Sequence, residues 1–178
     1  MVKVVIVNGA PESGKTTFQE ICRGKLADKG YTTIIKSSVD WVKDIAKYCG
    51  WDGTKTESNR RFLSDLKKAL TNWDDAVLRD LVNEVDNFYY TRVNCLFFID
   101  IREPEEIDKA KRVFNASTLL VKRPSKDNLV HQNDSDNNVF NYEYDYYIHN
   151  DKEISWLHEY ALAFVQELLE KEDNIYMP

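Results

Sequence analysis

The chain has 178 residues, a length typical of one domain with a single hydrophobic core. Hydrophobic residues make up 43% of it and charged residues 30%, which is ordinary globular composition. The formal net charge of −6 argues against a general nucleic-acid binder, because an acidic chain has no broad basic face to neutralise phosphates, so an anionic ligand would need local basic groups.

Apolar runs bounded by turns alternate with stretches of helical periodicity, which is the pattern of βα units on a parallel sheet. Of the predicted elements, the strands span 2–7, 32–35, 95–99, 118–121 and 144–148, and the helices 15–28, 39–48, 57–70, 74–90 and 153–172. The sequence therefore predicts a three-layer α/β/α domain with a parallel sheet of about five strands.

The stretch VVIVNGAPESGKTT joins the first predicted strand to the first predicted helix. Gly9, four further residues, Gly14, Lys15 and Thr16 match the P-loop pattern GxxxxGK[ST] in full. Two glycines allow the backbone to curl so that several N–H groups face one concavity, and the helix adds the positive end of its dipole. We expect this loop to bind the phosphates of ATP. The alternative is a glycine turn before a helix, with a solvated lysine.

Each side chain of the loop has an expected role. Lys15 would contact the β and γ phosphates, and the Thr16 hydroxyl would bind Mg²⁺. The remaining residues of the predicted nucleotide-binding loop are Pro11, Ser13 and Thr17.

Acidic residues follow two of the predicted strands. Asp100 ends the apolar run CLFFID, the Walker B arrangement, and it is the second expected metal residue beside Thr16. The alternative for Asp100 is an ordinary aspartate in a turn. Asp40 follows the second strand and either serves the acceptor or a magnesium-bound water, or caps the helix that begins at Trp41.

Four arginines are candidates for holding phosphate groups, since the planar guanidinium binds phosphate through two hydrogen bonds. Arg102 and Arg123 directly follow strands and are expected to be catalytic. Arg60 and Arg61 lie on a predicted helix, where neighbours point about 100° apart, so only one of them can face the site. A single arginine is otherwise usually a solvated surface residue.

The segment 124–141 is rich in Asn, Asp and Ser and poor in apolar residues. It is either a lid over the active site or a plain disordered loop, and composition does not separate the two. After Arg123 it offers Lys126 and His131 among several acidic residues.

Several stretches together resemble the P-loop nucleoside monophosphate kinases, and are most similar to the phage-type deoxynucleoside monophosphate kinases. They are GAPESGKT, IAKYCGWDGTKTESNRRFL, FFIDIREPEEI followed by LLVKRP, and YDYYIHND. The resemblance implies a core of residues 1–36, 91–123 and 143–172, an acceptor-binding helical insert of residues 37–90, and a lid of residues 124–142.

The same resemblance assigns further roles. It implies that Asp100 to Arg102 form the strand-end "DIR" motif, and that Lys55 and one of Arg60 and Arg61 belong to the acceptor site. Asp40 is added to that site only because it follows the second strand at the same edge. The resemblance places Asn150, within HND, in a loop that borders the adenine of ATP.

The expected function is the transfer of the γ-phosphoryl group of ATP, with Mg²⁺, to an acceptor phosphate on a (deoxy)nucleoside monophosphate. One alternative is a nucleotide-dependent switch or ATPase, and the other is a kinase of a small, non-nucleotide phosphorylated metabolite. No nucleic-acid or membrane partner is expected.

Cysteine usage and the absence of targeting signals predict a cytoplasmic protein. Cys22, Cys49 and Cys95 are odd in number and form no CxxC pair, so neither a disulfide framework nor a zinc site is indicated. The sequence has no signal peptide and no apolar run of about 18 residues.

Overall fold

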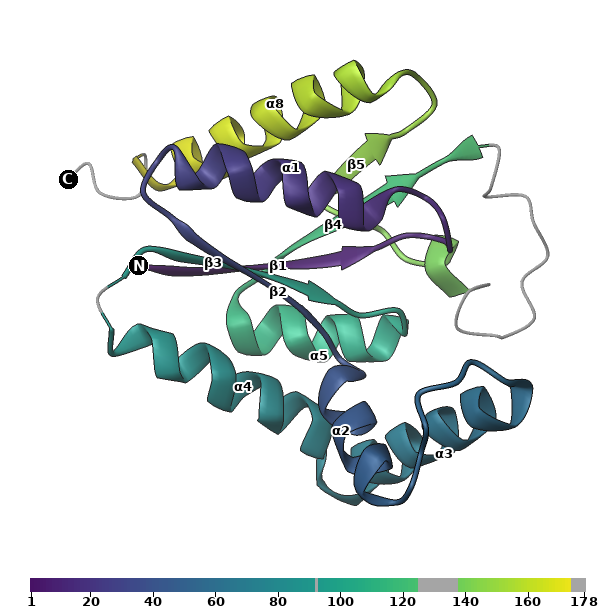
Figure 1. The fold of residues 1–178 in the computed structure, drawn as a ribbon. Coiled ribbons are helices and arrows are strands. Elements are labelled where there is room, and N and C mark those ends of the chain that lie inside the picture. Colours follow the sequence, from purple (N-terminus) through teal and green to yellow (C-terminus); the bar gives the residue numbers. More distant parts are fainter. Residues whose placement is uncertain (92, 125–137, 174–178) are drawn as a thin grey trace.

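A five-stranded parallel sheet forms the centre of the computed structural model, which describes residues 1–91, 93–124 and 138–173. The strands are β1 (Val2–Asn8), β2 (Thr32–Ser37), β3 (Cys95–Asp100), β4 (Ser117–Lys122) and β5 (Tyr146–His149). They lie in the order β2-β3-β1-β4-β5, with every neighbouring pair parallel (Figure 1). The predicted fold class is confirmed.

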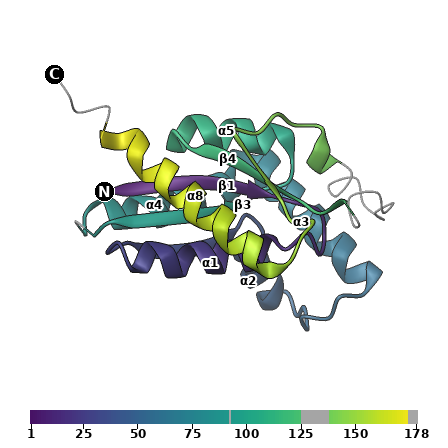
Figure 2. The same cartoon turned by 90° about the horizontal axis from the view of Figure 1, so that it is seen from above.

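Helices cover both faces of this sheet. In Figure 1, α1 (Lys15–Ala27) and α8 (Ile154–Asp173) lie on one face, and α4 (Ala76–Tyr89) and α5 (Pro104–Phe114) lie on the other. Figure 2, seen from above, shows α8 crossing the strands at an angle with α1 beside it.

The sequence of β1 explains why it is the central strand. Val5 and Val7 pack toward α1 and α8, while Val4 and Ile6 pack toward α4 and α5. Because successive side chains of a strand point to opposite faces, a strand buried on both sides must be apolar throughout, as VVIV is.

Three helices lie between β2 and β3, in the segment that the sequence assigns to a helical insert. It contains α2 (Asp40–Tyr48), α3 (Glu57–Asp74) and α4, and α3 has no buried residue. In Figure 1, α2 and α3 lie away from the sheet, toward the end where the strand arrows point. Asp75, with φ of 42°, separates α3 from α4, so the break falls a few residues later than predicted.

Two ion pairs fasten this insert to α5. Lys67 Nζ lies 2.6 Å from Glu106 Oε2, and Lys109 Nζ lies 2.5 Å from Asp75 Oδ1. Between the helices lies a cavity of about 20 Å³, room for about one water molecule, beside the buried Thr71 hydroxyl, which has no hydrogen-bond partner among the described residues.

Differences from the predicted elements are concentrated near the last strand. The sequence predicts a strand from residue 144, but β5 begins at Tyr146, after the short 3-10 helix Asn138–Phe140 and an irregular segment. Most of the predicted lid, including Lys126 and His131, lies outside the described residues. Among the helices that the structure describes, none has both the length and the apolar character to cross a membrane.

Candidate functional site

The loop between β1 and α1 is tightly curled. Ser13 N donates a 3.1 Å hydrogen bond to the Ala10 carbonyl, and Gly14 has a left-handed φ of 91°. A Cβ on Gly9 would lie 2.6 Å from Ser13 Oγ and 2.8 Å from the Val121 carbonyl oxygen, so the loop closes only with glycine at that position.

Several hydrogen-bond donors of this loop have no acceptor among the described residues. No side chain caps the N-terminus of α1, and the buried Ser13 hydroxyl has no hydrogen-bond partner in the described part of the chain. Uncapped helix N–H groups and an orphaned hydroxyl are the donors that a phosphate accepts. The cradle therefore fits the phosphate groups of a nucleotide. Among the other predicted loop residues, Thr16 and Thr17 are exposed in the first turn of α1, and Pro11 is half-buried.

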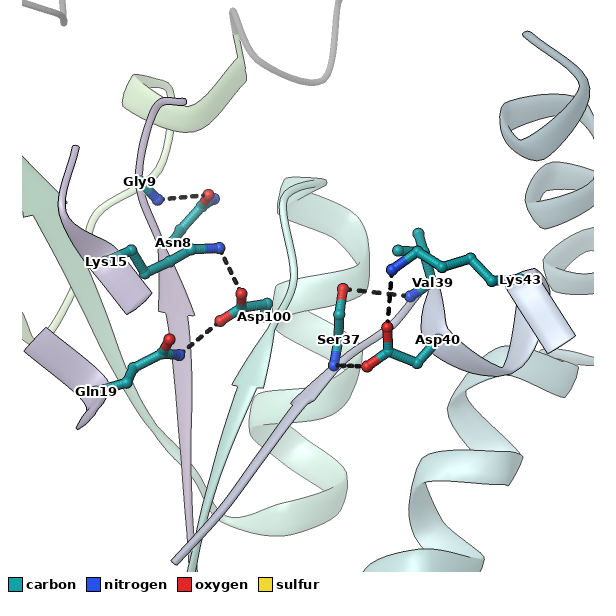
Figure 3. Close-up of polar contacts among 9 residues, drawn as sticks. All are labelled: Asn8, Gly9, Lys15, Gln19, Ser37, Val39, Asp40, Lys43 and Asp100. Atoms are coloured by element: carbon teal, nitrogen blue, oxygen red, sulfur yellow. Dashed lines mark hydrogen bonds and ion pairs between the residues drawn. The ribbon is translucent and has the colours of Figure 1, made fainter. Parts of the chain in front are cut away.

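Three side chains meet at the carboxyl end of β3 (Figure 3). Lys15 Nζ lies 2.6 Å from Asp100 Oδ2, and Gln19 Nε2 donates a 2.7 Å hydrogen bond to Asp100 Oδ1. Asp100 pairs in the sheet with Val7 of β1 and Ser37 of β2, so the central strands deliver its carboxylate to the mouth of the loop. The structure thus brings together the lysine and the aspartate that the sequence singled out.

A second, largely buried network begins at Asn8, where β1 leads into the loop. Asn8 Oδ1 accepts from Gly9 N at 2.8 Å, and Asn8 Nδ2 donates to Tyr144 Oη at 2.8 Å and to the Arg102 carbonyl at 3.2 Å. The Tyr144 hydroxyl donates in turn to the Val139 carbonyl at 2.8 Å. Burial raises the pKa of Tyr144, so its hydroxyl stays protonated and able to donate. We call these groups the Asn8–Tyr144 junction.

Residues that follow β4 and β5 also contact the loop. Arg123 Nη1 donates to the Glu12 carbonyl at 3.3 Å, and Asn150 Nδ2 donates to the Ser13 carbonyl at 2.9 Å. A Cβ on Gly14 would collide with the Asn150 amide. Arg102 is half-buried at the end of β3, and its carbonyl belongs to the Asn8–Tyr144 junction.

Asp40 belongs to a separate group, visible to the right in Figure 3. Its carboxylate accepts from Ser37 N at 2.8 Å and pairs with Lys43 Nζ at 2.9 Å. The helix begins at Asp40 itself and Val39 is its cap residue, so the expectation that Asp40 caps α2 is wrong.

The basic residues of the insert stand apart from the P-loop group. Lys55, Arg60 and Arg61 are exposed. The Arg61 side chain is 85% exposed and lies 3.9 Å from Asp65 one turn later, which is a loose surface pair. No described contact joins them to Lys15 or Asp100, so a role in the acceptor site stays a prediction.

Sequence reasoning missed Asn8, Gln19 and Tyr144. Gln19 lies one helical turn after Lys15, so helical spacing places both on the same side of α1, and that signal could have found it. Asn8 and Tyr144 are 136 residues apart, and no local pattern connects them.

No known family model matches the chain, and no curated protein does so. Solved structures resemble it in fold. A thymidylate kinase from Ehrlichia chaffeensis aligns over 92% of this chain and 98% of its own with a TM-score of 0.53 at 10% identity. An APS kinase from Mycobacterium tuberculosis aligns over 92% and 96% with a TM-score of 0.50 at 12% identity. A sugar kinase from Janibacter sp. aligns over 93% and 95% with a TM-score of 0.51 at 16% identity. The chain therefore has the fold of the P-loop kinases.

Proposed function

We propose that this protein is an ATP-dependent phosphotransferase whose acceptor is a (deoxy)nucleoside monophosphate. The observation that carries the proposal is the complete GxxxxGK[ST] loop, folded into a glycine-dependent cradle with the orphaned Ser13 hydroxyl, beside the Lys15–Asp100 pair. The structural neighbours named as kinases of thymidylate, of APS and of a sugar support a phosphotransferase with a small acceptor. The choice of a nucleoside monophosphate rests on the sequence resemblance.

The chain's own residues would act by positioning and by neutralising charge. When bound, Mg²⁺-ATP supplies the phosphoryl group, with the metal neutralising phosphate charge. The N–H groups of the loop, Lys15 and Ser13 would hold the phosphates, and Thr16 and Asp100 would hold the metal. Asn150 would border the base.

The acceptor side is assigned to the insert and to the strand-end arginines. Residues 37–90 would bind the acceptor through Asp40, Lys55 and one of Arg60 and Arg61. Arg102 and Arg123 would hold its phosphate and spread the charge that develops during transfer. Residues 124–142 would form the lid that excludes water, because an open site would hydrolyse ATP.

ADP release measured with and without a panel of nucleoside monophosphates tests this function. We expect release to depend strongly on one acceptor. Hydrolysis that no acceptor changes would instead indicate the switch or ATPase, and release that only a phosphorylated non-nucleotide stimulates would indicate the metabolite kinase. Thermal-shift screening of the same pairs with Mg²⁺-ATP identifies the acceptor, since a ligand bound only by the folded state raises Tm.

Lys15→Ala serves as the inactive variant in that assay. Removing the phosphate-binding cation is expected to lower kcat/KM by several powers of ten while circular dichroism shows an intact fold. A purified variant with near-native rates would rule Lys15 out as the phosphate-binding lysine.

A further inference from the structure

The Asp100 carboxylate is held by two different donors, one on each oxygen (Figure 3). Lys15 Nζ contacts Oδ2 at 2.6 Å, and Gln19 Nε2 contacts Oδ1 at 2.7 Å. The Asp100 side chain is 19% exposed, so it is only partly accessible to water. Its orientation is therefore set by these two contacts.

The two donors differ in what else they must do. Under the proposed function, Lys15 also binds the phosphates of ATP. When its ammonium group turns toward them, it moves away from Asp100. Gln19 has no assigned role in phosphate binding. Its side chain is completely buried in α1, one turn beyond Lys15, and Asp100 is the only partner of its amide group within the described residues.

The orientation of the Gln19 amide is fixed by charge. Exchanging its oxygen and nitrogen would turn Oε1 toward an anionic carboxylate, so the NH₂ group must face Asp100. That arrangement leaves Oε1 buried without a donor in the described part of the chain. An orphaned buried acceptor costs stability, and an apolar side chain would fill the same space without that cost. Packing alone therefore does not account for glutamine here.

We propose that Gln19 is a positioning residue that keeps the Asp100 carboxylate aligned toward the metal while Lys15 binds the phosphates. The inference rests on the proposed nucleotide site. It assigns Gln19 an effect on the metal-dependent part of nucleotide binding and none on the part that Lys15 and the loop provide.

Isothermal titration calorimetry with a non-hydrolysable ATP analogue, in EDTA and in Mg²⁺, separates these two parts. Gln19→Met keeps the length and volume of the side chain but removes the donor. We expect the gain in affinity that Mg²⁺ gives to fall about tenfold, the worth of one hydrogen bond to a charged group, while affinity in EDTA changes less than about threefold. Gln19→Asn, whose amide is one methylene too short, should show the same loss and serves if the methionine variant does not fold.

Cys22→Ala is the control. Cys22 is equally buried on the same helix and packs in the core, so its truncation should lower stability and leave both affinities in place. An unchanged Mg²⁺ gain in Gln19→Met, or an equal fall in both affinities, overturns the positioning role while leaving the nucleotide site intact. A wild-type protein that binds no triphosphate refutes the proposed function, and this inference falls with it.

Discussion

At the scale of single residues, the glycines of the first βα unit have opposite environments. Gly9 is surrounded so closely that a Cβ would meet both a side chain and a backbone carbonyl, whereas a Cβ on Gly24, in the last turn of α1, would meet nothing within 4 Å. The first glycine is thus required by the loop, and the second only weakens a helix.

Alanine at these two positions should act in opposite directions. Gly9→Ala is expected to lower the free energy of unfolding by about 1–3 kcal/mol, because the Val121 carbonyl cannot move out of the sheet, and to weaken triphosphate binding. Gly24→Ala should raise the free energy of unfolding by about 0.5–1 kcal/mol without changing triphosphate binding. Urea denaturation and calorimetry measure both effects. Native affinity in Gly9→Ala would show that the loop adapts and is not a rigid cradle.

At the scale of elements, the Asn8–Tyr144 junction joins three segments. It connects the start of the P-loop, the segment after β3 and the chain that leads into β5, through hydrogen bonds that are buried except for the part-buried contact with the Arg102 carbonyl. Such a network favours one arrangement of the three segments, because removing one member leaves buried polar groups without hydrogen-bond partners, which costs stability.

Tyr144→Phe tests this junction by removing one oxygen atom. The change leaves one Asn8 N–H and the Val139 carbonyl without a partner, so we expect a loss of about 1–3 kcal/mol in the free energy of unfolding. Tyr142→Phe is the matched control, because the Tyr142 hydroxyl bonds Asp108 at an exposed position and its loss should cost little. If the two variants lost the same free energy of unfolding in chemical denaturation, burial of the Asn8–Tyr144 junction would add nothing to stability.

A second link between elements carries a pH dependence. Asp145, just before β5, pairs with Lys111 of α5 at 2.9 Å and accepts from Thr118 N of β4 at 2.8 Å. Burial alone would raise the pKa of Asp145, but Lys111 and the two Thr118 donors outweigh it and hold that pKa below its ordinary value. A lowered pKa adds stability that is complete above about pH 4 and is lost as the pH falls through the folded-state value.

Asp145→Asn should therefore destabilise the protein most at neutral pH. The difference in Tm between variant and wild type is expected to shrink steadily below about pH 4, where the wild-type carboxylate is itself becoming protonated. Lys111→Met should reproduce part of this behaviour. A difference that is constant from pH 7 to pH 3 would contradict a linkage through Asp145.

Elements were predictable from this sequence, and contacts between them were less so. The strands were placed within about two residues because buried parallel strands are short apolar runs. Lys15 and Asp100 were found because each belongs to a recognisable local pattern, Lys15 at the start of the helix after the P-loop and Asp100 at the end of β3. Asn8 and Tyr144 were missed because their meeting depends on the order β1-β4-β5, which no local pattern contains. Of the two readings left open for Asp40, the cap of a helix beginning at Trp41 is excluded, because α2 already begins at Asp40 with Val39 as its cap residue.

At the scale of the whole molecule, the fold combines a rigid sheet with an insert whose helix α3 buries little, although its helix α4 packs on the sheet. β1 and β3 are buried along most of their length, whereas α3 has no fully buried residue and is held by neighbouring helices and by the partly buried ion pair Lys67–Glu106. Local opening costs least where little apolar surface is buried. We expect the insert to be the part that rearranges around an acceptor.

Native-state hydrogen exchange measures this difference directly. Amides of α3 should exchange first, those of α4 more slowly because Ala76, Val77, Leu81 and Val85 are buried, and those of β1 and β3 only through global unfolding. A non-hydrolysable ATP analogue alone should slow exchange in the P-loop and the first turn of α1. Protection of α3 should appear only when the acceptor is added, since the insert is assigned to the acceptor and the loop to the triphosphate. Exchange of α3 as slow as that of β3 in the free protein would show that the insert is part of the rigid core, and an acceptor would then have to bind without moving it.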